Sequence, residues 1–194
     1  MTAASEVMAT LCIAKDLMAL AKVSCTIGRE VNTLYGETYN GVKQMKENQF
    51  PDGIDPYKKP GDPSSGLLWG ISNEKLAPQD SGDKKVQAYN YRICLTNNPG
   101  NLIPIPRPAN FDSTWYELLL RLMKQTGKTT LNDYFIWTIK PNQKTDTNNE
   151  NGFSTDMKGM NRGYPDASYA DHEKIIANHT DYTKGLLYFA GHDQ

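Results

Sequence analysis

Cysteine is scarce in this sequence, and no metal-binding spacing of cysteine or histidine is present. Cys12, Cys25 and Cys94 are far apart and odd in number among 194 residues, and none belongs to a Cys-x-x-Cys pair. This usage argues against a disulfide framework and against a zinc site, and it predicts three small buried hydrophobic side chains. The three histidines form no His-Glu-x-x-His motif, so we expect no metal centre.

Excess charge of either sign is also lacking, as are long apolar runs. The formal net charge is -1, whereas a nucleic-acid site needs clustered Lys and Arg to neutralise phosphates. No apolar stretch is long enough to cross a bilayer. The first residues lack the basic-then-apolar order of a signal peptide. We therefore expect no nucleic-acid partner and no membrane contact. A cytoplasmic location is the default, and an upstream signal outside this sequence would instead make the protein periplasmic or secreted.

Glycine-rich nucleotide fingerprints are missing as well. No Gly-x-Gly-x-x-Gly occurs anywhere in the chain, although a tightly held dinucleotide usually has its pyrophosphate on such a turn at a helix N-terminus. Thr126-Gly-Lys-Thr129 resembles the end of a P-loop, but the position that requires the first Gly is Leu122. Asp146 to Gly152 resembles a calcium loop, but its Gly is seventh rather than sixth. A helix end and a polar turn are the better interpretations.

The residues that are present predict an α+β fold with a mixed or antiparallel sheet and flanking helices. Hydrophobic residues make up 38% of the chain, with 11 Tyr and 3 Trp, which is enough for a core. Apolar periodicity and turn residues predict helices, strands and loops in the following order: a helix over Met8–Ser24, an ordered loop over Phe50–Ser81, a strand over Val86–Leu95, a helix that begins with a capping box at Thr114–Glu117 and stops at Gly127, a short strand over Leu131–Ile139, a loop over Pro141–Asp156, and a helix from Ser168 to Phe189.

The predicted strand Val86–Leu95 carries the clearest chemical signal. Because residues two apart share a face of a strand, Asn90 and Arg92 should point the same way, roughly 7 Å apart. An amide beside a guanidinium suits an anion, a carboxylate, a sugar hydroxyl or the pyrimidine edge of a flavin. The other interpretation is an Arg that pairs with an Asp or Glu on the surface of a sheet. The pattern alone favours this ion pair by about two to one.

Several motifs in a fixed order resemble the middle of a bacterial family of FAD-dependent oxidoreductases. The similarity covers nearly the whole chain, from about Asp16 to Phe189. The segments that carry the resemblance are Ser24–Thr38, Asp55-Pro-Tyr57, Pro60–Gly66, Gln87–Arg92, Lys144–Asn149 and Phe153–Ser-Thr-Asp156. Relatives also have a Gly-containing stretch that completes the nucleotide-binding domain, and Ala9–Asp16 differs from it in spacing and has no Gly.

The resemblance implies a division of the chain and a set of functional residues. Residues 1–24 would be a helical remnant of, or junction to, a flavin-binding domain, and residues 25–194 would form a segment like a substrate domain. The complete enzyme would transfer hydride from an unidentified, sugar-like substrate to FAD, which this chain alone is not expected to retain. Its partners would be the flavin-binding remainder and a small-molecule substrate. The alternative is a non-catalytic binding or structural module from a truncated gene.

On this resemblance the strand and the polar loop supply the site. The expected catalytic residues are Arg92 and Asn90, and Asn90 also belongs with Gln87 and Tyr89 to the expected cofactor contacts. The expected substrate-binding residues are Asp146, Asn148 and Asn149.

Overall fold

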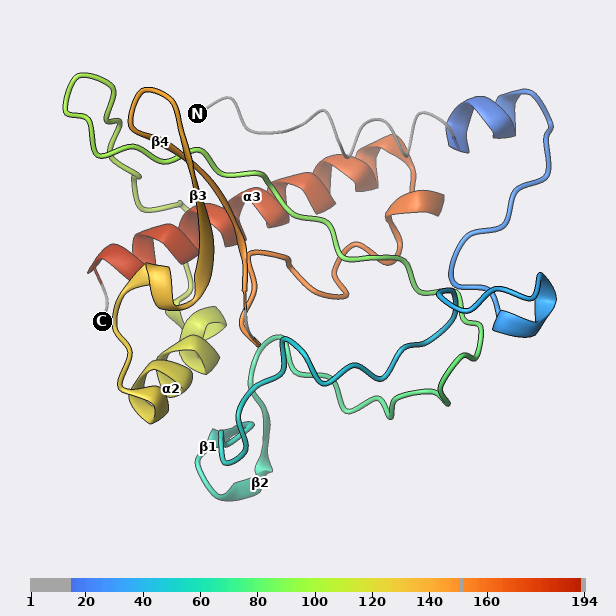
Figure 1. The fold of residues 1–194 in the computed structure, drawn as a ribbon, viewed down its shortest axis with the longest axis horizontal. Helices are drawn as coiled ribbons and strands as arrows, with labels where there is room; N and C mark the ends of the chain where they lie inside the picture. Colours follow the sequence, from blue (N-terminus) through green and yellow to red (C-terminus); the bar gives the residue numbers. More distant parts are fainter. Residues whose placement is uncertain (1–14, 151, 193–194) are drawn as a thin grey trace.

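The computed structural model describes residues 15–150 and 152–192, in which two long helices and two hairpins are joined by long loops (Figure 1). Residues 15–20 of the predicted Met8–Ser24 helix are helical, and residues 8–14 lie outside the described residues. The prediction is wrong for residues 21–24, which form a turn and irregular chain. The elements that follow are η1 (Asn32–Leu34), β1 (Tyr57–Lys59), β2 (Asp62–Leu67), η2 (Ser113–Tyr116), α2 (Glu117–Thr126), η3 (Leu131–Asp133), β3 (Phe135–Lys140), β4 (Lys144–Asn149), η4 (Tyr164–Asp166) and α3 (Tyr169–His192).

Helix α2 follows from its sequence, except at its start. Its apolar side chains recur at helical spacing, and Leu119 and Leu122 are buried. Gly127 ends the helix in the left-handed conformation at φ 69°, and its N–H donates to the carbonyl of Met123. The predicted capping box at Thr114 is wrong. The cap is Asp112, whose carboxylate accepts from the Thr114 N–H, and a 3-10 turn comes before the α-helix.

Helix α3 supplies most of the remaining core, as the predicted helix over Ser168–Phe189 anticipated. Leu186 and Phe189 pack against the buried face of α2, with Tyr116 between the two helices. The Tyr116 hydroxyl donates to the carbonyl of Tyr182 at 2.9 Å. The Tyr182 hydroxyl in turn donates to the carbonyl of Ser154 at 2.6 Å. These bonds connect both helices to the loop that precedes η4.

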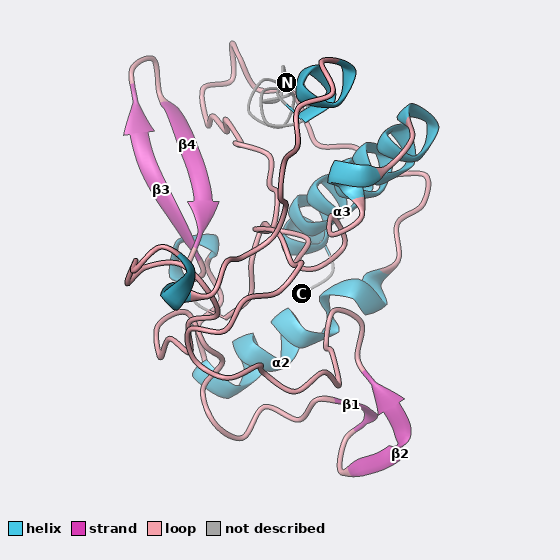
Figure 2. Cartoon of the chain, turned by 90° about the vertical axis from the view of Figure 1, so that its right-hand side faces the viewer, coloured by secondary structure: helices cyan, strands magenta, loops and turns pink. Residues whose placement is uncertain are grey.

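The strands form two separate antiparallel hairpins, which lie well apart in the molecule (Figure 2). β3 pairs with β4 in an unbroken register from Phe135↔Asn149 to Lys140↔Lys144. The prediction of a loop over Pro141–Asp156 is therefore wrong for β4. Only Thr147 of this very polar strand is fully buried, so its sequence shows no apolar alternation, and its strand conformation comes from pairing with β3.

The β1–β2 hairpin lies within the stretch predicted as an ordered loop. Asp55 stabilises it by accepting hydrogen bonds from the N–H groups of Tyr57 and Gly61. Arg121 of α2 donates to the carbonyls of Asp55 and Tyr57 at 2.9 and 2.7 Å. The stretch is thus ordered as expected, although the pair of short strands was not anticipated.

The two described cysteines correct a further expectation. Cys25 and Cys94 are exposed free thiols rather than buried hydrophobic side chains, and Cys12 lies outside the described residues. Within residues 15–150 and 152–192 no group of His, Cys, Asp and Glu is arranged to hold a metal ion. No helix in these same ranges is long and apolar enough to span a membrane.

Candidate functional site

The predicted strand Val86–Leu95 is extended, but it joins β4 only at its end. The Thr147 N–H donates to the carbonyl of Ile93 at 2.8 Å, and the Thr145 N–H donates to that of Leu95 at 2.9 Å. Isolated bridges at Ile93 and Thr96 are the result, rather than a regular strand. The predicted alternation nevertheless holds near this edge, because Tyr91 and Ile93 are buried while Arg92 is exposed.

The earlier part of this segment is not paired with a strand, and it contacts side chains instead. The carbonyl of Gln87 accepts from the amide Nδ2 of Asn161 at 2.7 Å, in place of a strand hydrogen bond. The Tyr89 ring meets the Tyr164 ring edge-on, with centroids 5.7 Å apart. These contacts explain why the strand prediction fails before residue 93.

Four of the predicted site residues come together where the segment passes β4. Asn90 Nδ2 donates to Asn148 Oδ1 at 3.1 Å. Arg92 Nε donates to Asp146 Oδ1 at 2.9 Å, and Nη2 of the same guanidinium donates to Asp146 Oδ2. Asp146 and Asn148 lie on one face of β4 because they are two residues apart. We call Asn90, Arg92, Asp146 and Asn148 the polar ladder.

The ladder has the ion pair that the pattern alone favoured, and its charges are stable near neutral pH. The hydrogen bonds from Arg92, together with its charge, hold the pKa of Asp146 below its usual range. Arg92 is 49% exposed and Asp146 24%. The pair therefore lies at the surface, where such pairs contribute little stability.

The other predicted residues are not part of the ladder. Asn149 is the next residue of β4, so its side chain belongs to the opposite face, and it pairs in register with Phe135 of β3. Gln87 is exposed and lines a separate polar cavity of about 640 Å³. Tyr89 packs on Tyr164 as described above.

Asp156 is a neighbour of the ladder that residue patterns alone did not single out. Burial raises the pKa of its carboxyl, against the opposing effects of Lys158 and of hydrogen bonds from Asn90 and Ser154. Lys158 as a whole residue is exposed, but its ammonium group donates to the carbonyl of Gly152 at 3.2 Å. The segment that carries Asp156 belonged to the motifs of the resemblance, but its proximity to Asn90 arises only in the folded chain.

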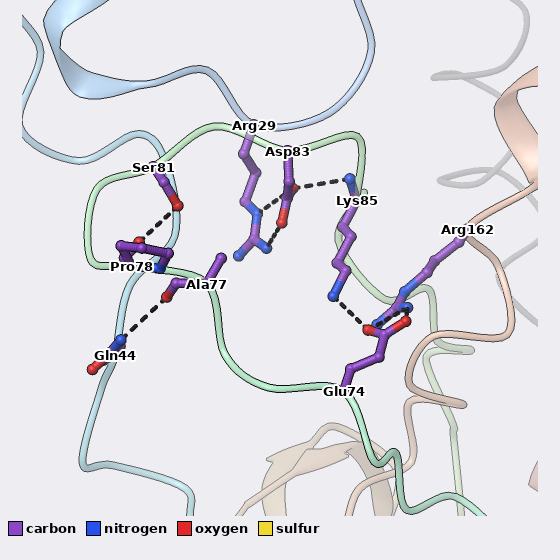
Figure 3. Close-up of polar contacts among 9 residues, drawn as sticks. All are labelled: Arg29, Gln44, Glu74, Ala77, Pro78, Ser81, Asp83, Lys85 and Arg162. Carbon is purple, nitrogen blue, oxygen red and sulfur yellow. Dashed lines mark hydrogen bonds and ion pairs between the residues drawn. The ribbon is translucent and has the colours of Figure 1, made fainter.

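The polar cavity beside Gln87 has walls whose charges are already paired (Figure 3). Arg29 forms a two-point ion pair with Asp83. Lys85 and Arg162 both contact Glu74, with nitrogen–oxygen distances of 2.6 and 3.2 Å. These pairs connect segments around residues 29, 74–85 and 162, and they leave no strong excess of positive charge for an anion.

The long helices do not fit the pyrophosphate of a dinucleotide. Asp112 caps the turn before α2, and Glu117 is the first residue of that helix. Asp171 is in the first turn of α3 and accepts from the Ser168 hydroxyl. Carboxylates at these positions compete with a phosphate for the helix N-terminus. The starts of α2 and α3 are therefore already occupied by carboxylates.

Comparison with known protein families finds a match over nearly the full length of the chain. The family model described as FAD dependent oxidoreductase matches residues 14–193. No curated protein and no solved structure matches the chain.

Proposed function

Because the chain belongs to the FAD dependent oxidoreductase family, we propose that it is the substrate-domain segment of such an enzyme, of bacterial type. In this proposal the complete enzyme oxidises a sugar-like substrate by hydride transfer, and FAD is the hydride acceptor. The observation that carries the proposal is the polar ladder, which gathers Asn90, Arg92, Asp146 and Asn148 on one edge of β4.

The ladder has suitable groups for a polyhydroxylated substrate. Its two amides can donate to and accept from hydroxyl groups, and its carboxylate can accept from them. A guanidinium has five N–H donors, and Asp146 engages only Nε and Nη2 of Arg92. Donors thus remain on Arg92 for a substrate oxygen, and its charge opposes negative charge that develops there. Asn149 would contact the same substrate from the other face of β4.

Cofactor contacts are proposed for Gln87, Tyr89 and Asn90, which precede the ladder or belong to it. They would face the reactive ring of the flavin and set its position against the substrate. The pyrophosphate half would be bound by another part of the enzyme, since α2 and α3 both begin with carboxylates. Asp156 would act as a positioning residue, because its carboxyl is a neighbour of the Asn90 amide.

Exposed apolar side chains support the proposal of a flavin-binding partner. Many of those that the structure describes as exposed fall between residues 17 and 45, and Leu20 and Tyr39 are 80% and 95% exposed. Apolar surface concentrated in one segment is typical of an interaction site. The flavin-binding remainder of the enzyme is the partner that we propose for it.

A non-catalytic binding or structural module is the second candidate. The observation that favours it is the two-point ion pair itself, because a guanidinium held by Asp146 can serve structure alone. The two candidates differ in what happens when the charge of Arg92 is removed.

The test is Arg92→Met in a full-length relative rebuilt around this segment, with Arg107→Met as the matched control. Arg107 is an exposed cation 5.0 Å from the Phe111 ring and lies outside the ladder. We expect turnover of Arg92→Met to fall about 100-fold or more, as for other lost electrostatic contacts in a site, while its melting temperature barely moves. Arg107→Met should keep its turnover. If Arg92→Met unfolds but retains activity per folded molecule, Arg92 is structural and the site assignment is wrong.

A further inference from the structure

We propose that a second cavity of this chain binds a small anion that has a hydrocarbon body, such as a medium-chain carboxylate. This cavity measures about 680 Å³ and lies between the extended residues 91–96, the loop at residues 101–105 and the second half of α3. We call it the apolar cavity. The inference does not rest on the proposed oxidoreductase function, because it concerns binding by this chain alone.

The walls of the apolar cavity can cover a hydrocarbon body. Tyr91, Ile93 and Leu187 form a small buried cluster, against which Leu95 and Ile105 pack. All five line the cavity. A cavity of this volume lined by apolar side chains is within the usual range for small-molecule sites. Burial of a hydrocarbon chain against these walls would therefore be favourable.

The loop at residues 101–105 forms an exposed part of the same wall. Leu102 is 48% exposed and Ile103 is 70% exposed, and both line the cavity. Large apolar side chains that lie half or more in solvent gain from contact with an apolar ligand. The cavity thus has a buried apolar floor and an apolar edge that is still in contact with water.

The charged side chains around the apolar cavity indicate the sign of the charge on the ligand. Arg92, Lys144 and Lys184 line it, and none of the Asp and Glu residues that the structure describes does. Asp146 neutralises Arg92. Among the described residues neither Lys144 nor Lys184 forms an ion pair, and both are exposed. Two unneutralised ammonium groups beside an apolar wall favour an anionic head group and disfavour a cationic one.

The contrast with the polar cavity beside Gln87 strengthens this assignment. There the cations Arg29, Lys85 and Arg162 are already held by Asp83 and Glu74. The two cavities are of similar volume, about 680 and 640 Å³. Only the apolar cavity combines unpaired cations with an apolar floor, so the anion is expected there and not in its neighbour.

Cys94 provides a direct readout, because this exposed thiol lines the apolar cavity. The exposed thiol of Cys25 does not line it and serves as the internal reference. The experiment measures the rate of maleimide modification at each thiol by peptide mass spectrometry, with decanoate, decanol or decyltrimethylammonium added below micelle-forming concentrations. We expect decanoate to slow Cys94 several-fold at a concentration where the cationic compound has no effect, and Cys25 to react at an unchanged rate.

The double variant Lys144→Gln/Lys184→Gln tests the source of the charge selectivity. Because exposed ion pairs are each worth modest energies, the decanoate concentration that half-protects Cys94 should rise about 5- to 10-fold. Lys128→Gln/Lys174→Gln removes the same charge away from the cavity and should change nothing. Equal protection by the anionic and cationic compounds, no protection of Cys94, or an equal effect of the two double variants would overturn the proposal.

Discussion

Gly185 allows a sharp test of how α3 packs on α2. A Cβ at this position would overlap the hydroxyl oxygen of Tyr116 and lie 3.2 Å from its ring carbon Cζ. Tyr116 is only 1% exposed and donates to the carbonyl of Tyr182 at 2.9 Å. The ring is enclosed, so it cannot move aside without disturbing that bond and the packing of Phe189 against it.

The magnitude for Gly185→Ala follows from three contributions. Overpacking of a core costs about 1–3 kcal/mol, and the buried Tyr116 hydroxyl left without its acceptor costs about 1–3 kcal/mol. Replacement of Gly by Ala within a helix returns about 0.5–1 kcal/mol. We therefore expect the free energy of unfolding to fall by about 2–4 kcal/mol, which should be visible as a lower midpoint in urea with an unchanged slope.

Gly191 of the same helix is the matched control. A Cβ there meets no heavy atom within 4 Å, so Gly191→Ala should be neutral or stabilise by up to about 1 kcal/mol. Adding Tyr116→Phe to Gly185→Ala removes the overlapping oxygen and should recover part of the loss, whereas independent sites would add. If Gly185→Ala unfolds at the same urea concentration as Gly191→Ala, the packing of the two helices described here is incorrect.

Two further predictions concern pH and a tight backbone approach. Burial raises the pKa values of Tyr116 and Tyr182 well above the ordinary value, so both stay protonated in the folded state while the unfolded chain loses its phenolic protons. The stability that these two groups contribute should therefore be constant below about pH 10 and fall above it. A urea midpoint that does not decline above that pH would contradict the burial of these rings. Gly28 has φ +113°, and a Cβ added there would overlap the carbonyl oxygen of Asp83, whereas Gly36, at φ +69°, has open space around it. Gly28→Ala should therefore lower the thermal midpoint clearly more than Gly36→Ala. Equal shifts would show that the backbone bridge between Arg29 and Asp83 is absent.

The parts of the fold that could be predicted are those encoded by local periodicity. Apolar spacing gave α2 and α3, and Gly127 marked a true helix end because it adopts positive φ. The β4 strand could not be predicted, since only Thr147 is buried and the other positions are polar. Its conformation depends on hydrogen bonds to β3, which are tertiary information.

The candidate site was predictable in its residues but not in its connections. The spacing of Asn90 and Arg92 placed them on one side of the chain, and that alternation is observed near Ile93. Their partners Asn148 and Asp146 are 58 and 54 residues away, so no local pattern could pair them. Asp156 could not be predicted for the same reason, because its burial and its proximity to Asn90 arise only in the folded chain.

We propose that this chain supplies the substrate-facing part of an FAD enzyme and that the pyrophosphate of FAD is bound by another part of that enzyme. The most direct test incubates the purified chain with excess FAD and measures flavin absorbance per mole of protein after gel filtration. We expect no retained flavin, because α2 and α3 begin with carboxylates and the sequence has no Gly-x-Gly-x-x-Gly turn. Retention of about one FAD per chain would contradict it.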